Sequence, residues 1–270
     1  MTDITDRYDF CHLLIETAGH LAVEYFVRLD MLEVETKASG QDVVTIADRA
    51  VEDLIRAEIA KSFPEDGILG EEHGEQEGSS GWIWVVDPIG GTASFLAGLR
   101  DWCISIAAVK NGVTEIGMIL QPTTGDLYVA RKGAGALLNR RQIAVRPEAQ
   151  ITRHALGFGT NPRVPPEEAT AFIATLLGAG GMFYRNGSGA LMLAYVAGGR
   201  LCGYYEAHIN AWDCLAGLLL IREAGGWARD YPGADVPLSA GGPVLACVPG
   251  VRASLIRLVG QAKGAEPARG

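Results

Sequence analysis

The feature that most constrains the fold is a series of short apolar or alternating segments between residues 103 and 145. Asn111-Gly112 and Thr124-Gly125 separate the first three segments, and both pairs are typical of hairpin turns. Strands are expected at 103–110, 114–120, 126–131, 136–138 and 142–145. Because tight turns join antiparallel neighbours, this part of the chain is predicted to form an antiparallel meander.

Two segments with helical periodicity precede the meander. Apolar residues recur on one face over 8–26 and again over 46–59, and Phe63-Pro64 ends the second helix. Short strands are expected at 68–69 and 82–86. Helices followed by antiparallel strands predict a layered α+β part over residues 1–150.

After about residue 150, predicted strands and helices alternate, which indicates an α/β part over residues 151–270. Strands are expected near 155–158, 182–185, 201–206, 227–230 and 244–247, and helices near 166–177, 190–197, 213–224 and 251–261. Residues 37–42 are expected to form a polar loop and 264–270 a frayed tail. No linker or repeat separates the two parts, so they are expected to form one compact unit.

The composition restricts the partners of this 270-residue chain. It has 32 acidic and 23 basic residues, and the formal net charge of −9 argues against nucleic acid, which needs a basic surface. The acidic excess fits a cation-binding protein, but solubility explains it equally well. No apolar run is long enough to span a bilayer and no signal-peptide pattern is present, so we expect a cytoplasmic protein with no membrane partner. The five cysteines lack CxxC spacing and are expected to be reduced, buried thiols.

Four acidic residues stand at the ends of predicted elements: Asp48, Glu71, Asp87 and Asp213. Most have an ordinary structural explanation. The residues around Asp48 fit a helix capping box, Glu71 could be a solvated loop charge, and Asp213 suits a helix N-terminus. Asp87 is the hardest to explain in this way, because it places a charge at the end of a strongly apolar strand.

Taken together, these acids suggest magnesium chemistry. Mg²⁺ prefers oxygen ligands and binds through few carboxylates together with water and phosphate. Glu71, Asp87 and Asp213 would suit such ions, with the carbonyl of Ile89 and the hydroxyl of Thr92. A carboxylate that bridges two ions allows two-metal hydrolysis, in which one ion activates a water and the other neutralises the leaving oxygen.

The chain also offers places for a phosphate. Gly91 and Thr92 provide backbone donors beside Asp87, and Thr92 could orient the attacking water with the help of Asp48. The segment Gly187-Ser188-Gly189 precedes a predicted helix, whose positive end could receive an anion. A plain glycine-rich helix start explains this segment equally well.

In these blocks the chain resembles the inositol monophosphatase family of magnesium-dependent, lithium-sensitive phosphatases. The blocks follow the family's order over about residues 10–260, at 42–48, 70–72, 84–95, 187–190 and 211–226. The resemblance implies a layered α/β/α/β/α sandwich of the inositol monophosphatase and fructose-1,6-bisphosphatase type. It also implies a homodimer, two to three Mg²⁺ ions and a small phosphorylated metabolite as the substrate.

The resemblance further implies roles for individual residues. The metal ligands would be Glu71, Asp87, the Ile89 carbonyl and Asp213, with Asp87 as the bridging carboxylate. The catalytic residues would be Asp48, Glu71 and Thr92. Substrate contacts are expected from Gly91, Thr92, Gly187, Ser188 and Glu206. Glu206 falls where the family contacts substrate hydroxyls, although it could also be an acid that merely ends a strand.

Gly90 departs from the family pattern. The family has Asp-Pro-Ile-Asp-Gly-Thr where this chain reads Asp87-Pro88-Ile89-Gly90-Gly91-Thr92. Glycine supplies no carboxylate, so we expect the second ion to be bound more weakly, with water in the vacant position.

These observations favour a phosphomonoesterase that hydrolyses a small polyol phosphate, such as inositol monophosphate, by in-line attack of a metal-bound water. Histidinol-phosphate phosphatase is an alternative, because Glu206 could meet either a hydroxyl or an ammonium group. Bisphosphorylated nucleotide and fructose substrates also remain open. A different class is a catalytically impaired relative that keeps the fold as a module for binding a ligand or a protein.

Overall fold

The computed structural model describes residues 3–29, 34–36, 43–233 and 236–264. The expected polar loop at 37–42 and residues 265–270 of the expected tail lie outside them. The helices are α1 (Asp3–Phe26), α2 (Ile46–Ser62), α3 (Thr92–Leu96), α4 (Pro166–Gly178), α5 (Gly189–Ala197), α6 (Ala211–Glu223) and α7 (Arg252–Gly264). The strands are β1 (Val34–Thr36), β2 (Val43–Thr45), β3 (Gly67–Gly70), β4 (Gly74–Gln76), β5 (Trp82–Gly90), β6 (Cys103–Lys110), β7 (Val113–Gln121), β8 (Asp126–Arg131), β9 (Ala136–Leu138), β10 (Arg141–Ile143), β11 (Leu156–Gly159), β12 (Phe183–Tyr184), β13 (Gly203–Ile209), β14 (Trp227–Ala228) and β15 (Gly242–Cys247).

The larger sheet has eight strands in the order β10-β9-β8-β7-β6-β5-β3-β4. Strands β5 to β10 are consecutive antiparallel neighbours, which confirms the predicted meander. Strand β3 pairs with β5 in parallel and brings residue 70 beside Val86. This pairing places the loop after β3 next to the polar end of β5.

The smaller sheet has five strands in the order β12-β11-β13-β15-β14. Strands β12, β11 and β13 run parallel, so their carboxyl ends share one edge of the sheet. Strands β15 and β14 complete the sheet in antiparallel orientation. The loops that follow β11 and β12 therefore emerge at the same edge.

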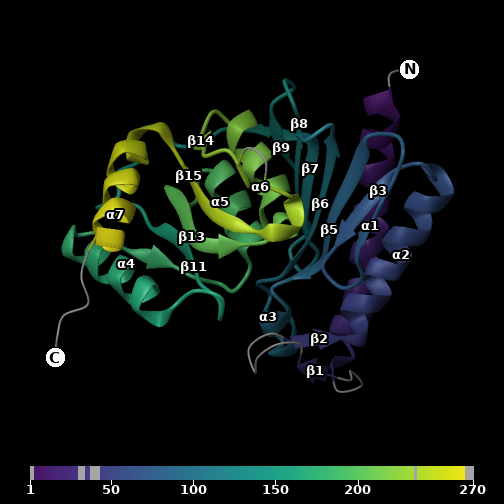
Figure 1. The fold of residues 1–270 in the computed structure, drawn as a ribbon, viewed down its shortest axis with the longest axis horizontal. Helices are drawn as coiled ribbons and strands as arrows, with labels where there is room; N and C mark the ends of the chain where they lie inside the picture. Colours follow the sequence, from purple (N-terminus) through teal and green to yellow (C-terminus); the bar gives the residue numbers. More distant parts are fainter. Residues whose placement is uncertain (1–2, 30–33, 37–42, 234–235, 265–270) are drawn as a thin grey trace.

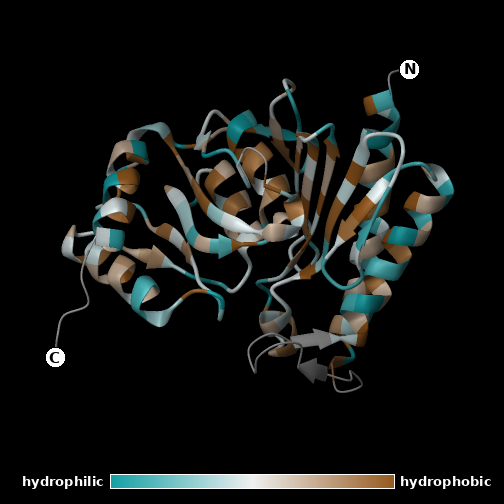
Figure 2. Ribbon diagram, viewed as in Figure 1, coloured by the Kyte–Doolittle hydropathy of each residue, from teal (hydrophilic) through white to brown (hydrophobic). Residues whose placement is uncertain are grey.

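The elements stack in five layers (Figure 1). Helices α1 and α2 cover the outer face of the larger sheet, α5 and α6 lie between the two sheets, and α4 and α7 cover the smaller sheet from outside. The strands and the two central helices are mainly apolar, whereas α2 carries polar residues on its outer side (Figure 2). The expected α/β/α/β/α sandwich is therefore confirmed.

Helix α6 approaches the larger sheet very closely, because a glycine faces it. A Cβ atom built on Gly117 of β7 would lie 2.8 Å from the carbonyl oxygen of Ala216 in α6. On the opposite side, a Cβ on Gly217 would lie 2.4 Å from the Cβ of Leu193 in α5. Because Gly117 and Gly217 have no side chains, α6 can pack this closely between β7 and α5.

Several further expectations can be compared with the structure. The five cysteines are buried free thiols, as predicted. Within the described residues, no helix is long and apolar enough to cross a membrane. Sequence periodicity did not indicate the short elements β1, β2, β4 and α3. The division of the chain near residue 150 stays a prediction.

We expect Gly117→Ala to destabilise the protein, because the added methyl group would meet the backbone of α6. Overpacking of this kind costs about 1–3 kcal/mol of unfolding free energy. Gly178→Ala is the matched control, since a Cβ at this last residue of α4 would have nothing within 4 Å. Chemical denaturation would measure both variants, and equal stabilities of the two would contradict the proposed close contact.

Candidate active site

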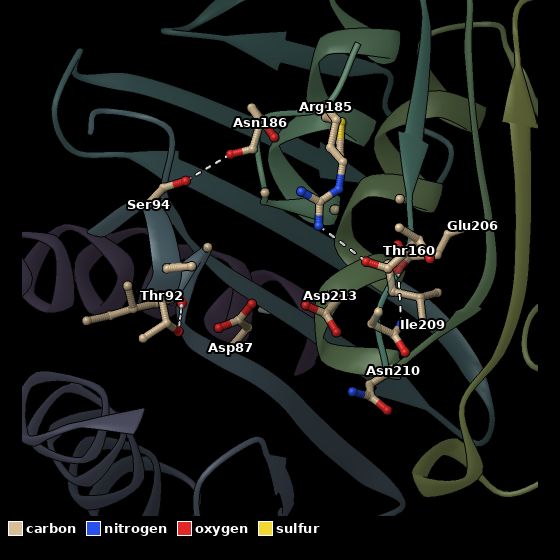
Figure 3. Close-up of a pocket in the computed structure, with 18 of the residues that line it drawn as sticks. Asp87, Thr92, Ser94, Thr160, Arg185, Asn186, Glu206, Ile209, Asn210 and Asp213 are labelled. Carbon is tan, nitrogen blue, oxygen red and sulfur yellow. Dashed lines mark hydrogen bonds between the residues drawn. The ribbon is translucent and has the colours of Figure 1, made fainter. Parts of the chain in front are cut away.

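A polar pocket of about 930 Å³ opens where residues from both sheets meet. Its walls come from the end of β5, the first residues of α3, the loops after β11 and β12, strand β13 and the start of α6. Asp87 and Asp213 lie side by side at its centre, with Thr92 beside Asp87 and with Asn210 and Glu206 on the side of Asp213 (Figure 3). Thus side chains that are 126 residues apart in sequence share one cavity.

A short chain of contacts brings Asp87 and Asp213 together. Asp87 is paired with Ser105 across β5 and β6. The Ser105 hydroxyl donates a 2.9 Å hydrogen bond to the carbonyl oxygen of Trp212. Trp212 immediately precedes Asp213 in the first turn of α6. The larger sheet therefore holds the start of the central helix directly.

A cation would stabilise the two neighbouring carboxyl groups in their ionised form. Asp87 is fully buried. Burial raises the pKa of Asp213 to about 6, against the hydrogen bonds from Asn210 and the positive charge of Arg163. A cation between the two carboxyl groups would favour the ionised form of both.

The donor set in the pocket fits magnesium. Glu71, Asp87 and Asp213 all line it, together with Ile89 and Thr92. Among the described residues, however, no three His, Cys, Asp or Glu side chains converge as a preformed metal cluster. Mg²⁺ is commonly bound by one or two carboxylates together with waters and substrate phosphate, so the pair Asp87 and Asp213 suffices for one ion.

Gly90 leaves space that the Asp87 carboxylate occupies. A Cβ built on Gly90 would lie 2.5 Å from Oδ2 of Asp87 and 3.4 Å from Sγ of Cys103. The pairing of β5 with β6 shifts register between Asp87 and Gly90. Any larger residue at position 90 therefore requires the Asp87 side chain to turn away.

Asp48 makes both the capping contacts and the contact with Thr92 that its sequence context suggested. One oxygen, Oδ2, accepts hydrogen bonds from the backbone and hydroxyl of Thr45 and completes the capping box of α2. The other oxygen, Oδ1, lies 3.2 Å from the hydroxyl of Thr92, which also lies 3.1 Å from the carbonyl oxygen of Ile89. The Thr92 proton can serve either acceptor. Asp48 itself is buried and reaches the pocket through Thr92.

The loop that carries Glu71 is held by a residue that the sequence did not single out. Glu52 of α2 is fully buried and accepts hydrogen bonds from the backbone N–H groups of Glu72 (2.8 Å) and His73 (3.2 Å). It has room because residue 70 is glycine, whose Cβ would lie 2.2 Å from Oε1 of Glu52. The sequence feature that could have revealed Glu52 is its place on the inner side of α2. Periodicity alone, however, does not distinguish a buried glutamate in a helix from an exposed one.

The residues expected to contact phosphate differ in whether they line the pocket. Gly91 and Gly187 line the pocket with positive φ values of 103° and 92°, which favour glycine. Ser188 does not line it. Its hydroxyl caps α5 by accepting from the N–H of Leu191, and its own N–H donates to Oδ1 of Asn186 at 3.0 Å. For Ser188, the geometry therefore matches the helix-start interpretation.

Glu206 lines the opposite wall in a hydrogen-bonded setting. The Tyr204 hydroxyl donates to its Oε2, and the amide of Asn161 donates to its Oε1 at 3.1 Å. Burial raises the pKa of Glu206 to about 7, and Asp213 adds to this effect, against the bonds from Tyr204 and Asn161. Burial therefore makes Glu206 hold its proton to a higher pH than an exposed glutamate does.

Sequence reasoning missed several other polar residues of the pocket. Asn161 and Arg163 follow β11, Arg185 follows β12, and Tyr204 belongs to β13. None belongs to a motif with characteristic spacing. Only the parallel pairing of β12, β11 and β13 brings them to one edge, and that pairing cannot be read from local sequence.

Known proteins resemble this chain in sequence and in structure. The sequence profile of the inositol monophosphatase family matches residues 6–262. The chain is 40% identical to an inositol-1-monophosphatase of Rhizobium meliloti over 228 residues, which span 83% of this chain and 85% of that protein. It is also 40% identical to the Nus factor SuhB of Xylella fastidiosa over 223 residues, or 82% and 80% of the two chains. Among solved structures, the extragenic suppressor protein suhB of Bartonella henselae superimposes with a TM-score of 0.86 at 30% identity, covering 96% of this chain and 98% of that one.

The setting of Glu206 predicts a pH-dependent stability. Because its folded-state pKa is raised above the unfolded value near 4.3, its contribution is fully present below that value and is lost as the pH rises towards 7. Between pH 5 and pH 8, the wild type should lose on the order of 2 kcal/mol more unfolding free energy than Glu206→Gln. Denaturation at several pH values without added metal ions measures this difference. Glu148→Gln, which alters an exposed acid, should follow the wild type; parallel profiles for the wild type and Glu206→Gln would refute the assignment.

Proposed function

Because the chain belongs to the inositol monophosphatase family, we propose that it is a Mg²⁺-dependent phosphomonoesterase acting on a small polyol phosphate such as inositol monophosphate. The observation that carries this proposal is the convergence of Asp87 and Asp213 with Glu71, Ile89 and Thr92 in one pocket. These residues come from different layers of the fold. They offer the oxygen ligands and the hydroxyl group that metal-assisted phosphate hydrolysis requires.

Glu71, Asp87, the Ile89 carbonyl and Asp213 would hold the magnesium. When bound, the metal supplies charge neutralisation of the phosphate and activation of a water. Two to three ions would bind there, with the second held weakly because Gly90 adds no carboxylate. Backbone groups at Gly91 and Thr92 would position the phosphate beside Asp87.

Thr92 and Asp48 would orient the attacking water. When the Thr92 hydroxyl donates its proton to Oδ1 of Asp48, its oxygen remains free to accept a hydrogen bond from water. The capping interactions at Oδ2 hold the Asp48 carboxylate in place. The pair can thus fix the direction in which the water approaches phosphorus.

Glu206 would contact the alcohol part of the ester. Burial raises its pKa to about 7, so its protonated form is more accessible than that of an exposed glutamate. A substrate hydroxyl can donate to the ionised form and accept from the protonated form, whereas an ammonium group suits only the ionised form. This favours a polyol phosphate over histidinol phosphate, which we retain as the alternative substrate.

Gly90 favours a second candidate function, a catalytically impaired member of the family that binds a phosphorylated ligand or a protein. Removing one carboxylate lowers the affinity for a cation without disturbing the fold around it. One of the similar proteins is named a Nus factor rather than a phosphatase. The two candidates differ in turnover and share the pocket.

We also propose a homodimer. Strand β12 is the edge strand of the smaller sheet, and Met182, Phe183 and Tyr184 in and before it have exposed fractions of 49%, 43% and 36%. Neighbouring apolar side chains on an open edge are typical of a surface that another chain covers. Sedimentation velocity should give twice the mass of 28.7 kDa for the wild type and a monomer for Phe183→Glu. Val113→Glu, which alters an exposed apolar residue elsewhere, should leave the mass unchanged; a monomeric wild type would contradict the proposal.

Phosphate release tests the activity directly. In the presence of Mg²⁺, inositol 1-phosphate should be hydrolysed, and histidinol phosphate should be hydrolysed more slowly. Neither should be hydrolysed after chelation of the metal. Thr92→Val should reduce kcat by about 10²-fold or more, because the water loses its orienting group. If no phosphomonoester releases phosphate at high enzyme concentration, the enzyme hypothesis is wrong and the binding module remains.

In the same phosphate-release assay, Gly90→Asp and Gly90→Ala separate two effects of position 90. One is the absence of a metal-binding carboxylate, and the other is the space that the Asp87 side chain needs. Both variants displace the Asp87 side chain, but only the aspartate adds a carboxylate. We expect Gly90→Asp to raise Mg²⁺ affinity and turnover by about tenfold or more, and Gly90→Ala to raise neither. Unchanged turnover in Gly90→Asp would show that the glycine is fully accommodated.

A further inference from the structure

Glu71 is the first residue of the tight turn that joins β3 to β4. Gly70 at the end of β3 pairs with Gly74 at the start of β4, so the turn spans residues 71–73. The N–H of Glu71 donates to the carbonyl oxygen of Val86 in β5 at 3.3 Å. The larger sheet thus fixes the beginning of the turn. The direction of the Glu71 side chain, which lines the pocket, also depends on what holds the residues that follow it.

Helix α2 holds the remainder of this turn. The Glu52 carboxylate accepts hydrogen bonds from the N–H groups of Glu72 and His73, with a different oxygen for each. One helical turn further along α2, Nη2 of Arg56 donates a hydrogen bond to the carbonyl oxygen of Gly74. Two side chains of one helix therefore bind backbone groups of three successive residues.

Glu52 and Arg56 also form an ion pair that is largely shielded from water. Nε of Arg56 lies 2.7 Å from Oε1 of Glu52, and the two side chains have exposed fractions of 15% and 0%. A buried ion pair is weak evidence for stability, because the desolvation of both charges offsets their attraction. Its hydrogen bonds to the backbone are charge-assisted, and they are directional. The clearest effect of this pair is therefore to fix the geometry of the turn.

The same side of α2 reaches the pocket at a second point. Asp48, Glu52 and Arg56 are spaced four residues apart, so they lie in one row along the helix. At the start of this row, Asp48 contacts the hydroxyl of Thr92, which lines the pocket. The helix is thus anchored at the pocket by one member of the row, and the other two reach from there to the turn.

We propose that Glu52 and Arg56 are positioning residues for Mg²⁺ binding, which hold the turn so that the Glu71 carboxylate is directed at the ion. This inference rests on the proposed function for the role of Glu71 as a metal ligand. Neither Glu52 nor Arg56 lines the pocket, so both act through the turn. Loss of either side chain is expected to weaken Mg²⁺ binding while Glu71 itself is retained.

Charge effects and positioning predict opposite results for Arg56. Arg56→Met removes a positive charge, so by Coulomb's law alone the affinity for a cation should rise. If Arg56 positions Glu71, the affinity should instead fall by about threefold or more, measured by titrating the metal-free protein calorimetrically with Mg²⁺. Lys61→Met removes an exposed positive charge from the last turn of the same helix and should stay within about twofold of the wild type.

A double-mutant cycle tests whether Glu52 acts through Glu71. Glu71→Gln should weaken Mg²⁺ binding by about tenfold or more, and Glu52→Gln by about threefold or more. In the Glu71→Gln background, Glu52→Gln should change the Kd by less than about twofold. A general structural or electrostatic role of Glu52 would instead weaken binding in both backgrounds. Glu58→Gln, which alters a half-exposed acid of α2, should match the wild type.

Thermal unfolding verifies that each variant is folded, and if Glu52→Gln is not, Arg56→Met in both Glu71 backgrounds completes the same cycle. The inference is overturned if Arg56→Met binds Mg²⁺ as tightly as the wild type or more tightly, or if the effect persists in full without Glu71. A wild type that binds no Mg²⁺, or Glu71→Gln with wild-type affinity, would overturn the assignment of Glu71 as a ligand as well. A chain that shows the expected affinities but releases no phosphate would contradict the proposed activity alone.

Discussion

The close packing of α6 between the two sheets governs the geometry of the pocket. Gly117 and Gly217 allow the helix to approach β7 on one side and α5 on the other. The hydrogen bond from Ser105 to the Trp212 carbonyl then fixes the beginning of the helix against the strand pair that carries Asp87. Because cores at this density transmit small displacements, a shift of α6 would separate Asp213 from Asp87.

Structural and functional interpretations of an acidic residue are not exclusive in this fold. Asp48 uses one carboxylate oxygen to cap α2 and the other to contact Thr92. The capping bonds restrict the rotation of the carboxylate, which is what an orienting residue requires. Glu52 acts on the site indirectly, because it accepts hydrogen bonds from the two N–H groups that follow Glu71 in the chain. A local sequence pattern that predicts a structural role for an acidic residue therefore does not exclude a role in the site.

The sequence predicted those parts of the molecule that depend on local periodicity or on a distinctive motif. The strands of the meander alternate over 103–131, and Asp87 and Asp213 stand at clear element ends, so both could be assigned in advance. Arg163 and Arg185 could not, because only the parallel pairing of β11 with β12 brings their loops together. The side chain of Ser188 illustrates another limit: a glycine-rich helix start looks the same whether its hydroxyl receives a ligand or caps the helix. Sequence thus indicated the central acids better than the rim of the pocket.

Gly90 changes the charge balance of the pocket as well as its set of ligands. Without an acid at this position, the Asp87 carboxylate fills the vacated space and the acidic centre has one negative charge fewer than the family pattern supplies. Glu206 and Asp213 have raised pKa values of about 7 and about 6, so part of their charge is also lost in mildly acidic solution. Burial of Glu206 and Asp213 therefore makes the acidic charge of the pocket, and with it the attraction for a cation, weaker as the pH falls.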